Sequence, residues 1–312
     1  QTMIEMVGAC LWPEYLKGKF MILFGEGGNG KSVFYDVVSQ FLGDENVSGW
    51  DLQDLGNNRF ATSALVGKYA NIGGDMDSVK VKNTGVLKKL TGGDKMMVEQ
   101  KNENAVVFVN SATLMFGANR PPVIDEASRA VKRRLVPVRL PYEFTNDPDE
   151  IGESEHVKAA KDEDVLKSEL TTDDELAGLL NMALDGLDRL RDNGDVSLPE
   201  SQEERLEYYE QFSDPIKEFA VRCLENEQNS RVEKDSVYSA YKAFCADRDY
   251  TNRQKSTFFR QLARTTFDVN TVRAGSDGQR TQMLDSATFT DVGETYAPEY
   301  FEDDEAADDD AA

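Results

Sequence analysis

The sequence predicts an α/β protein whose first domain is built on a mainly parallel β-sheet, and three observations support this fold class. The apolar run Phe20–Phe24 is followed by a glycine-rich segment, residues 25–32, and then by an amphipathic stretch. Two further apolar runs, residues 69–72 and Thr113–Ala118, lead into polar side chains and alternate with helical patterns. Strands that alternate with helices in this way form parallel sheets, which bind ligands at the carboxyl edge of the strands.

Residues 25–32 read GEGGNGKS and match the spacing G-x-x-x-x-G-K-[ST] of a phosphate-binding loop (P-loop). The glycines let backbone N–H groups close around phosphate oxygens, and the N-terminus of the next helix adds a positive dipole. We expect Lys31 to neutralise the β- and γ-phosphates of ATP and Ser32 to bind Mg²⁺. The alternative is a glycine-rich turn that binds nothing. The expected cofactor-binding residues are Gly25, Gly28, Asn29, Gly30, Lys31 and Ser32.

Polar residues at the ends of the other two predicted strands complete the expected site. Asp75, with Asp77 as a second candidate, follows residues 69–72 and is expected to hold Mg²⁺ or to polarise the attacking water. Asn119 follows Thr113–Ala118 and precedes two prolines, so its amide is placed to bind the attacking water or the γ-phosphate. The competing interpretations are an ordinary strand-end turn at Asp75 and a capping role for Asn119.

Two basic features follow in the first domain. Residues 95–100 and 105–110 alternate apolar and polar side chains, which predicts a β-hairpin. The basic triplet 132–134 precedes the last predicted strand, residues 134–138, and Arg133 or Arg134 could reach a phosphate in a neighbouring subunit. The alternative interpretation is that the triplet forms an ordinary solvated surface patch.

Composition limits the possible functions. The 312 residues are 39% hydrophobic and carry a net charge of −23, with the acidic residues concentrated in 151–210 and near the C-terminus. No apolar run approaches the ~20 residues of a membrane span, and no signal segment is visible, which favours a cytoplasmic protein without a membrane partner. The three cysteines and the single histidine, His156, form no metal-binding pattern, so we expect core thiols and a surface histidine. The acid excess also suits a halophilic source, which we hold as a hypothesis.

A second, smaller domain is predicted at residues 212–285, where three helical patterns precede a two-stranded ribbon. That order is typical of a winged helix. Residues 252–280 contain six basic and two acidic side chains, and the candidate contacts to duplex DNA are Arg253, Lys255, Arg260 and Arg264. A module that docks on protein partners is the alternative. Residues 146–211 are expected to form an acidic helical linker or lid, and residues 286–312 an acidic disordered tail.

Four ordered motifs in residues 1–145 resemble the superfamily 3 helicase part of phage, plasmid and poxvirus-type primase-helicases. They are GEGGNGKS at 25–32, LKKLTGGD at 87–94, FGANRPP at 116–122, and RRLVPV at 133–138 followed by PYEF at 141–144. The resemblance implies an AAA+-like P-loop ATPase that assembles as a ring, usually a hexamer, and pulls single-stranded DNA through its centre. A winged-helix domain follows the motor in that family.

The resemblance assigns roles to matching positions of the nucleotide site. Lys31 and Ser32 match the phosphate and Mg²⁺ residues, and Asn119 matches the sensor. Asp75 occupies the acidic strand-end position, although the family usually has Glu there after a more apolar strand. Arg133 or Arg134 matches the arginine finger that completes a neighbour's site.

The resemblance also assigns a role to the predicted hairpin. It occupies the place of the pore hairpin that grips DNA, so Lys95 and Lys101 are the implied contacts to single-stranded DNA. The hairpin is less basic than is usual in the family.

The leading hypothesis is an ATP-driven DNA helicase motor of a viral or plasmid replication protein in a prokaryotic or archaeal host. The alternative is an ATP-regulated origin-binding or helicase-loading protein whose winged helix binds duplex DNA without unwinding it. A P-loop kinase of small molecules is a third hypothesis, which the sequence disfavours because nothing resembles a substrate lid and the winged-helix domain would be unexplained. Because the sequence begins at Gln1 rather than Met, we expect a fragment of a longer chain, in which a primase domain could precede it.

Overall fold

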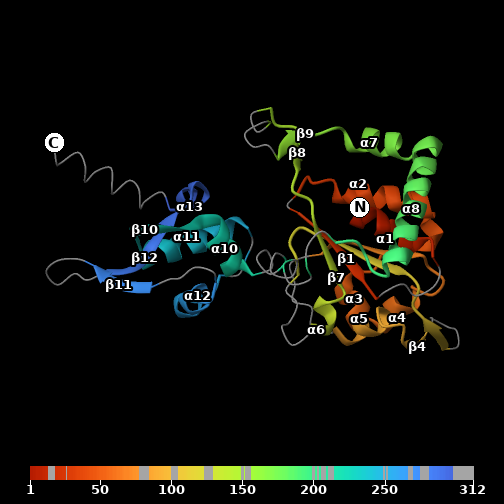
Figure 1. Ribbon diagram of the computed structural model, residues 1–312, viewed down its shortest axis with the longest axis horizontal. Helices are drawn as coiled ribbons and strands as arrows, with labels where there is room; N and C mark the ends of the chain where they lie inside the picture. Colours follow the sequence, from red (N-terminus) through yellow and green to blue (C-terminus); the bar gives the residue numbers. More distant parts are fainter. Residues whose placement is uncertain are drawn as a thin grey trace. The chain divides into compact units, whose positions relative to one another are not determined.

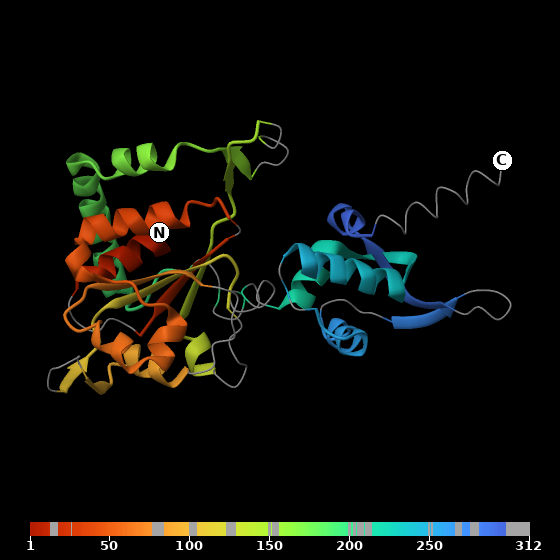
Figure 2. The same cartoon turned by 180° about the vertical axis from the view of Figure 1, so that it is seen from behind.

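The computed structural model describes residues 1–12, 18–25, 27–76, 84–99, 105–122, 129–148, 151, 156–198, 201, 204, 209, 214–248, 250, 252–265, 270–274 and 281–297. The chain divides into two compact units, residues 1–209 and residues 210–312. Figures 1 and 2 show both units from opposite sides.

A five-stranded parallel sheet forms the centre of the first unit, in the order β2-β3-β6-β1-β7. The strands are β1 (Phe20–Phe24), β2 (Val47–Ser48), β3 (Ala70–Met76), β6 (Thr113–Ala118) and β7 (Leu135–Arg139). All five side chains of β1 are buried, as expected for a central strand between two helical layers. The predicted parallel α/β fold is therefore confirmed.

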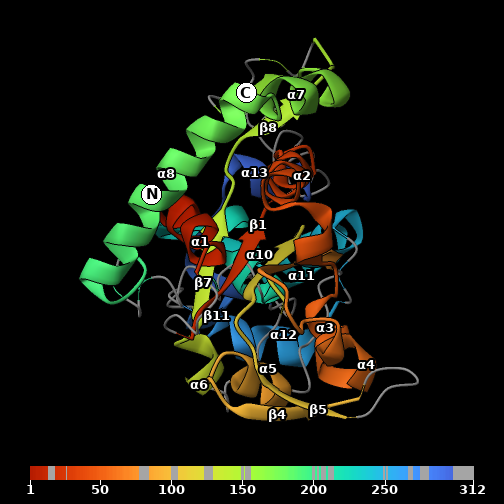
Figure 3. The same cartoon turned by 90° about the vertical axis from the view of Figure 1, so that its right-hand side faces the viewer.

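Helices cover both faces of this sheet, as Figure 3 shows. On one face lie α1 (Thr2–Cys10), α2 (Lys31–Leu42) and α8 (Asp173–Asn193), and on the other lie α3 (Leu52–Asn57), α4 (Arg59–Ser63), α5 (Thr84–Leu90) and α6 (Arg129–Lys132). A short 3-10 helix, Asp44–Asn46, links α2 to β2. Three smaller elements complete the unit: the predicted hairpin β4 (Lys95–Val98) with β5 (Val106–Val109), the parallel pair β8 (Glu143–Thr145) with β9 (Val157–Ala159), and α7 (Glu163–Leu170).

Helix α8 packs directly against α1, so the structure groups it with the first unit and not with a separate linker. A Cβ atom on Gly8 would lie 2.4 Å from the Ala183 carbonyl oxygen, which shows how closely the two backbones approach. The carboxylate of Glu5, fully buried on α1, accepts a hydrogen bond from the Ser197 N–H at 2.6 Å. The apolar face of α8 supplies Ala183, Leu187 and Leu190 to this contact.

The second unit contains one more strand than the sequence predicts. Its elements are α10 (Pro215–Cys223), β10 (Leu224–Glu233), α11 (Lys234–Asp247), α12 (Lys255–Leu262), β11 (Asn270–Ala274), β12 (Thr281–Phe289) and α13 (Asp291–Thr295). The strands form an antiparallel sheet in the order β10-β12-β11. Strand β10 has only two buried residues, Leu224 and Val232, so its sequence lacks the apolar alternation of a half-buried strand.

An aromatic core holds the second unit together. The rings of Tyr241 and Phe258 stack with centroids 4.3 Å apart, and Phe219 makes edge contacts with both. Phe289 and Ala297 are buried in the same core. Residues 286–297 therefore belong to the folded unit and not to the acidic tail predicted from residue 286. Only two of the ten acidic residues after position 285, Asp291 and Glu294, precede Ala297. Residues 298–312 lie outside the described residues.

Two predictions about single residue types are confirmed. Cys10, Cys223 and Cys245 are buried free thiols, and His156 is exposed. Among the described residues, no helix combines the length and the apolar character that crossing a bilayer requires.

Candidate functional site

The predicted phosphate loop lies at the carboxyl edge of the parallel sheet, between β1 and α2. Strand β1 ends at Phe24, which is opposite Ala118 of β6 on one side and Arg139 of β7 on the other. The N–H of Gly25 donates to the Ala118 carbonyl at 3.3 Å, so the loop begins against the end of β6. This is the edge at which parallel α/β sheets bind their ligands.

The backbone of the loop requires glycine at two positions. Gly28 and Gly30 have φ angles of +72° and +80°, which side chains with a Cβ atom rarely adopt. A Cβ on Gly30 would meet no atom within 4 Å, so the space beside it is open. Gly30 is also the N-cap of α2, and the first turn of that helix therefore presents its free N–H groups to the loop.

The side chain of Lys31 is folded into this loop. It is buried, and its ammonium donates to the Gly25 carbonyl oxygen at 2.7 Å and to Asn29 Oδ1 at 3.2 Å. Asn29 is held from the other side, because its Nδ2 donates to the Tyr142 carbonyl at 2.8 Å. The Phe144 N–H donates to the Gly28 carbonyl at 2.9 Å. The loop is thus braced by residues 142–144, a part of the fourth motif to which the sequence analysis assigned no role.

The other predicted residues of the nucleotide site lie at the same edge of the sheet. The backbone of Asp75 lies within β3, opposite Gly117, although the sequence predicts it just after the strand; its side chain is outside the described part. Asn119 is exposed and follows Ala118, the residue opposite Phe24. Asp77, the second candidate, is outside the described residues.

Tyr209 fixes the segment that follows Asn119. It is buried, its hydroxyl donates to the Pro122 carbonyl at 2.6 Å, and its ring makes an edge contact with Phe24 at 6.1 Å between centroids. Burial raises the pKa of the Tyr209 phenol well above its ordinary value, so the hydroxyl stays a donor. Sequence analysis did not find Tyr209, which lies 87 residues from its partner.

A cavity of about 360 Å³ adjoins the loop. One wall is α2 with Lys31, Ser32, Tyr35 and Asp36, and the opposite wall comes from β2, β3 and β6. Ser48, at the end of β2, is buried, and its Oγ has no hydrogen-bond partner among the described residues. The cavity therefore offers a partly polar space next to Ser32.

The chemistry of this edge fits a magnesium ion. Ser32 is exposed in the first turn of α2, and the backbone of Asp75 lies opposite Gly117 at the same edge of the sheet. Hydroxyl and carboxylate oxygens are ligands that Mg²⁺ prefers. Asp36 is already engaged, because it pairs with Lys167 of α7. The hydrogen bonds that Lys167 donates to Asp36 and Glu163 raise the pKa of its ammonium.

The two candidate arginine fingers lie at the opposite edge of the sheet. The Arg134 carbonyl accepts a hydrogen bond from the N–H of Phe20, the first residue of β1, and Lys19 donates to the Arg133 carbonyl at 3.1 Å. Arg133 is exposed, and Arg134 is half-buried with its Nη1 on the Ala130 carbonyl at 2.5 Å. The five residues of β1 separate the two edges by about 16 Å. These arginines and the loop therefore do not meet within one copy.

The predicted DNA contacts are exposed where the structure describes them. Lys95 begins β4, and its outward neighbours Met97, Val107 and Val109 make this hairpin face mainly apolar. Lys101 lies outside the described residues. In the second unit, Arg253, Lys255, Arg260 and Arg264 are exposed on and around α12.

One cation of the second unit has an unusual environment. The ammonium of Lys234 lies 4.3 Å from the ring centre of Phe259, and Lys255 pairs with Asp235. Burial, followed by repulsion from Lys255, lowers the pKa of Lys234. Lys234, which was not among the basic residues predicted from the sequence, is therefore a further cation next to α12.

Two protein families match separate parts of the chain. Residues 23–134 match a family of unknown function (DUF5906), and residues 211–293 match the family described as poxvirus D5 protein-like. The first range covers the phosphate loop and strands β2, β3 and β6, and the second covers most of the second unit.

Several viral proteins are similar in sequence. "Putative helicase V13" of the Sputnik virophage is 28% identical over 199 residues, which are 58% of this chain and 24% of that protein. "Putative helicase L207/L206" of Acanthamoeba polyphaga mimivirus is 23% identical over 92% of this chain and 32% of that protein. "Putative primase C962R" of African swine fever virus (isolate Warthog/Namibia/Wart80/1980) is 25% identical over 48% of this chain and 17% of that protein. The chain thus spans between 17% and 32% of the length of these three relatives.

One solved structure that matches the backbone of this chain is the A form apo structure of the NrS-1 C-terminal region. The match covers 91% of this chain and 70% of that one, with 14% sequence identity and a TM-score of 0.41.

Proposed function

We propose that this chain, which is related to the viral primase-helicases, is the ATP-hydrolysing motor of a replication helicase that translocates single-stranded DNA through a ring of identical copies. The observation that carries the proposal is the meeting of three predicted groups at one edge of the sheet. These are residues 25–32, the backbone position of Asp75 and the exposed Asn119. A phosphate loop, an acidic residue and an amide at adjacent strand ends suit phosphoryl transfer to water.

In this proposal Lys31 exchanges partners when ATP binds. Its ammonium leaves the Gly25 carbonyl and Asn29 Oδ1 and takes phosphate oxygens, while the N–H groups of the loop and of the first turn of α2 bind the remaining oxygens. Ser32 and Asp75 would hold Mg²⁺, which supplies charge neutralisation between the phosphates. Asn119 would orient the attacking water, and Tyr209 would keep the segment after Asn119 in place.

A second copy is required because the arginines lie on the far side of the sheet. With Arg133 and Arg134 about 16 Å from the loop of their own copy, either reaches a phosphate only if the amino edge of one sheet faces the carboxyl edge of another. Such a head-to-tail contact is heterologous, and it closes into a ring when the rotation per copy permits. A hexamer is the proposed ring size.

DNA would be bound by two separate surfaces. The exposed face of the β4–β5 hairpin, with Lys95 and its apolar neighbours, suits the backbone and bases of a single strand. In the second unit, the element order helix, strand, helix, helix, strand, strand supports the winged-helix assignment. Its helix α12 would then lie in the major groove of duplex DNA, with Arg260 exposed to contact it.

The exposed basic side chains around α12 also favour a second candidate function. An origin-binding or helicase-loading protein would bind duplex DNA through this surface and use ATP to control assembly, without unwinding. The test measures ATP hydrolysis with and without single-stranded DNA, together with displacement of a labelled strand from a forked duplex. The motor predicts DNA-stimulated hydrolysis and strand displacement. Tight duplex binding with hydrolysis but without displacement, at every salt concentration, would favour the second candidate.

A further inference from the structure

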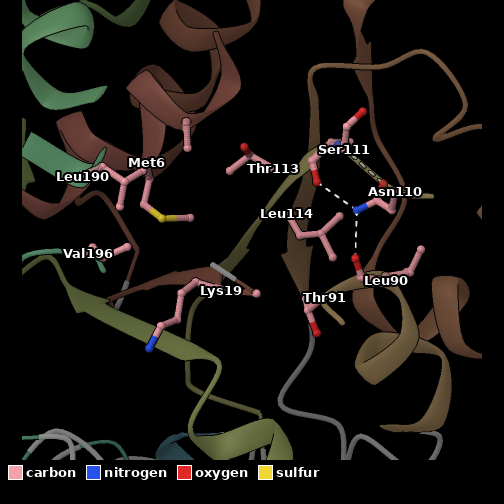
Figure 4. Close-up of a pocket in the computed structure, with 13 residues that line it drawn as sticks. Met6, Lys19, Leu90, Thr91, Asn110, Ser111, Thr113, Leu114, Leu190 and Val196 are labelled. Carbon is pink, nitrogen blue, oxygen red and sulfur yellow. Dashed lines mark hydrogen bonds between the residues drawn. The ribbon is translucent and has the colours of Figure 1, made fainter. Parts of the chain in front are cut away.

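Asn110 is a buried side chain placed between the β4–β5 hairpin and the central strand β6. It directly follows Val109, the last residue of β5, and lies three residues before Thr113, the first residue of β6. Only 4% of its surface is exposed. Figure 4 shows its amide at the amino edge of the sheet, lining a cavity of about 30 Å³ that has room for a single water.

The Asn110 amide joins three segments of the chain. Its Nδ2 donates to the carbonyl of Leu90, the last residue of α5, at 3.2 Å, and to the Ala112 carbonyl at 3.0 Å. Its Oδ1 accepts from the Ala112 N–H at 3.3 Å. The end of α5, the end of β5 and the start of β6 are therefore tied together by one side chain.

This connection fixes both ends of the hairpin, called its feet below: the turn that leads into β4 and the last residue of β5. Strand β4 begins at Lys95, shortly after Leu90, and the intervening turn is anchored by the buried Thr91, whose hydroxyl donates to the Leu87 carbonyl at 2.6 Å. In the described part of the chain, β4 and β5 pair only with each other. A two-stranded hairpin has little stability of its own in water, so its orientation depends on its feet and on the helix it packs against.

Strand β6 leads from this connection to the nucleotide site. Residues 114–118 are buried, and the strand pairs with β3 on one side and with β1 on the other. Its six residues span about 20 Å and end immediately before Asn119. A strand held on both sides moves as a rigid element, and rigid elements of this kind carry energetic coupling between distant sites.

We propose that Asn110 is a positioning residue that couples DNA on the hairpin to ATP hydrolysis, by holding the two feet of the hairpin to the start of β6. A displacement of the hairpin then acts on the start of β6, and the strand carries it to Asn119 at its other end. This inference rests on the proposed function, since it requires ATP at residues 25–32 and DNA on the hairpin. Asn110 itself contacts neither.

The test compares Asn110→Ala with Asn71→Ala as a matched control. Asn71 is buried as well, and its amide makes two backbone hydrogen bonds to Trp50, at 3.1 and 2.8 Å, where Asn110 makes three; it lies on β3 and not at the hairpin. Four quantities are measured for each variant: the melting temperature, the basal ATPase rate, the rate at saturating single-stranded DNA, and the Kd for that DNA. Both variants should lose similar stability, because each loses comparable buried hydrogen bonds.

Only Asn110→Ala should lose the coupling. We expect its basal rate and its Kd for single-stranded DNA to stay within about twofold of wild type, while stimulation by saturating DNA nearly disappears. Asn71→Ala should keep the wild-type ratio of stimulated to basal rate. Should Asn110→Ala fail to fold, Asn110→Ser serves with the same expectations, because its hydroxyl can still accept from the Ala112 N–H while its shorter side chain loses the bond to the Leu90 carbonyl.

Two results would overturn the inference. One is a wild-type ratio of stimulated to basal rate in the Asn110 variant, and the other is a Kd for DNA that rises in parallel with the loss of stimulation, which would mean that Asn110 only shapes the hairpin. A wild-type protein without ATPase activity would instead refute the proposed function itself.

Discussion

The Lys31 ammonium lies 2.7 Å from the carbonyl oxygen of Gly25, across the width of the phosphate loop. The ammonium therefore already lies inside the loop, where phosphate oxygens would bind it. The N-terminus of α2, capped at Gly30 without a side-chain hydrogen bond, adds its N–H groups and its positive dipole beside this cation, which favours binding of a polyanion.

Replacing Lys31 by Ala should abolish ATP turnover. The side chain is expected to stabilise charge on the transferred phosphoryl group, and removing one such contact costs at least about 100-fold in kcat. Lys161→Ala is the matched control, because Lys161 is half-exposed and pairs with Glu169, away from the loop. Steady-state rates of phosphate release measure the effect. A Lys31→Ala rate within threefold of the control would contradict the assignment.

Tyr209→Phe should weaken both the fold and the catalytic edge of the first unit. The change removes the hydrogen bond to the Pro122 carbonyl and keeps the ring against Phe24. A buried carbonyl left without its donor costs about 1–3 kcal/mol of unfolding free energy. We expect that loss in urea unfolding together with a severalfold lower ATPase rate. Tyr238→Phe removes an exposed hydroxyl that bonds the Arg253 carbonyl and should leave hydrolysis unchanged; equal effects of the two changes would count against a special role for Tyr209.

The double variant Arg260→Ala/Arg264→Ala should bind duplex DNA more weakly. Both side chains are exposed beside the buried Phe258 and Leu262, which fix α12 on the core of the second unit. Each lost phosphate contact lowers the slope of log affinity against log salt by about 0.9. Fluorescence anisotropy between low and moderate salt measures both effects. An unchanged slope would show that α12 does not contact the DNA backbone.

Alkaline pH should destabilise the folded chain. Burial raises the pKa of the Cys10 and Cys223 thiols from 9.0 to about 12. Since these groups hold their protons more tightly in the folded state, their contribution is complete below the unfolded pKa and is lost as pH rises from 9 to about 12.

Thermal melting over that pH range measures the loss. The variant Cys10→Ala/Cys223→Ala should begin to lose stability at a higher pH than wild type, although its cavities lower the melting temperature at neutral pH. Identical pH profiles for the two proteins would rule out the thiols as the cause.

The sequence predicts those parts of the fold and of the site whose pattern lies within a few consecutive residues. The apolar run of β1, the glycines at 25–30 and the Lys31-Ser32 pair are contiguous, and their spacing alone predicts a strand, a loop and a helix. The hairpin β4–β5 was predicted for the same reason, because its alternation lies within a few residues of its turn.

The features that were missed depend on distant or polar partners. Tyr209 reaches Pro122 across 87 residues, and no local pattern marks either of them as partners. Strand β10 is mostly exposed, so pairing with β12 and not apolar content makes it a strand. The boundary of the tail was placed too early because the acidic residues after 285 are interspersed with Phe289 and Ala297, which fill the core.

The central claim is that the arginine of one copy completes the nucleotide site of another, and mixing two inactive variants tests it most directly. Lys31→Ala lacks a working loop but keeps Arg133 and Arg134, whereas Arg133→Ala/Arg134→Ala keeps the loop and lacks both guanidinium groups. Each protein alone should be inactive. An equal mixture should regain up to about a quarter of the wild-type ATPase rate, because in head-to-tail assemblies one interface in four pairs a working loop with working arginines. No recovery in a mixture that native mass spectrometry shows to contain mixed assemblies, or full activity of the double arginine variant alone, would contradict the account.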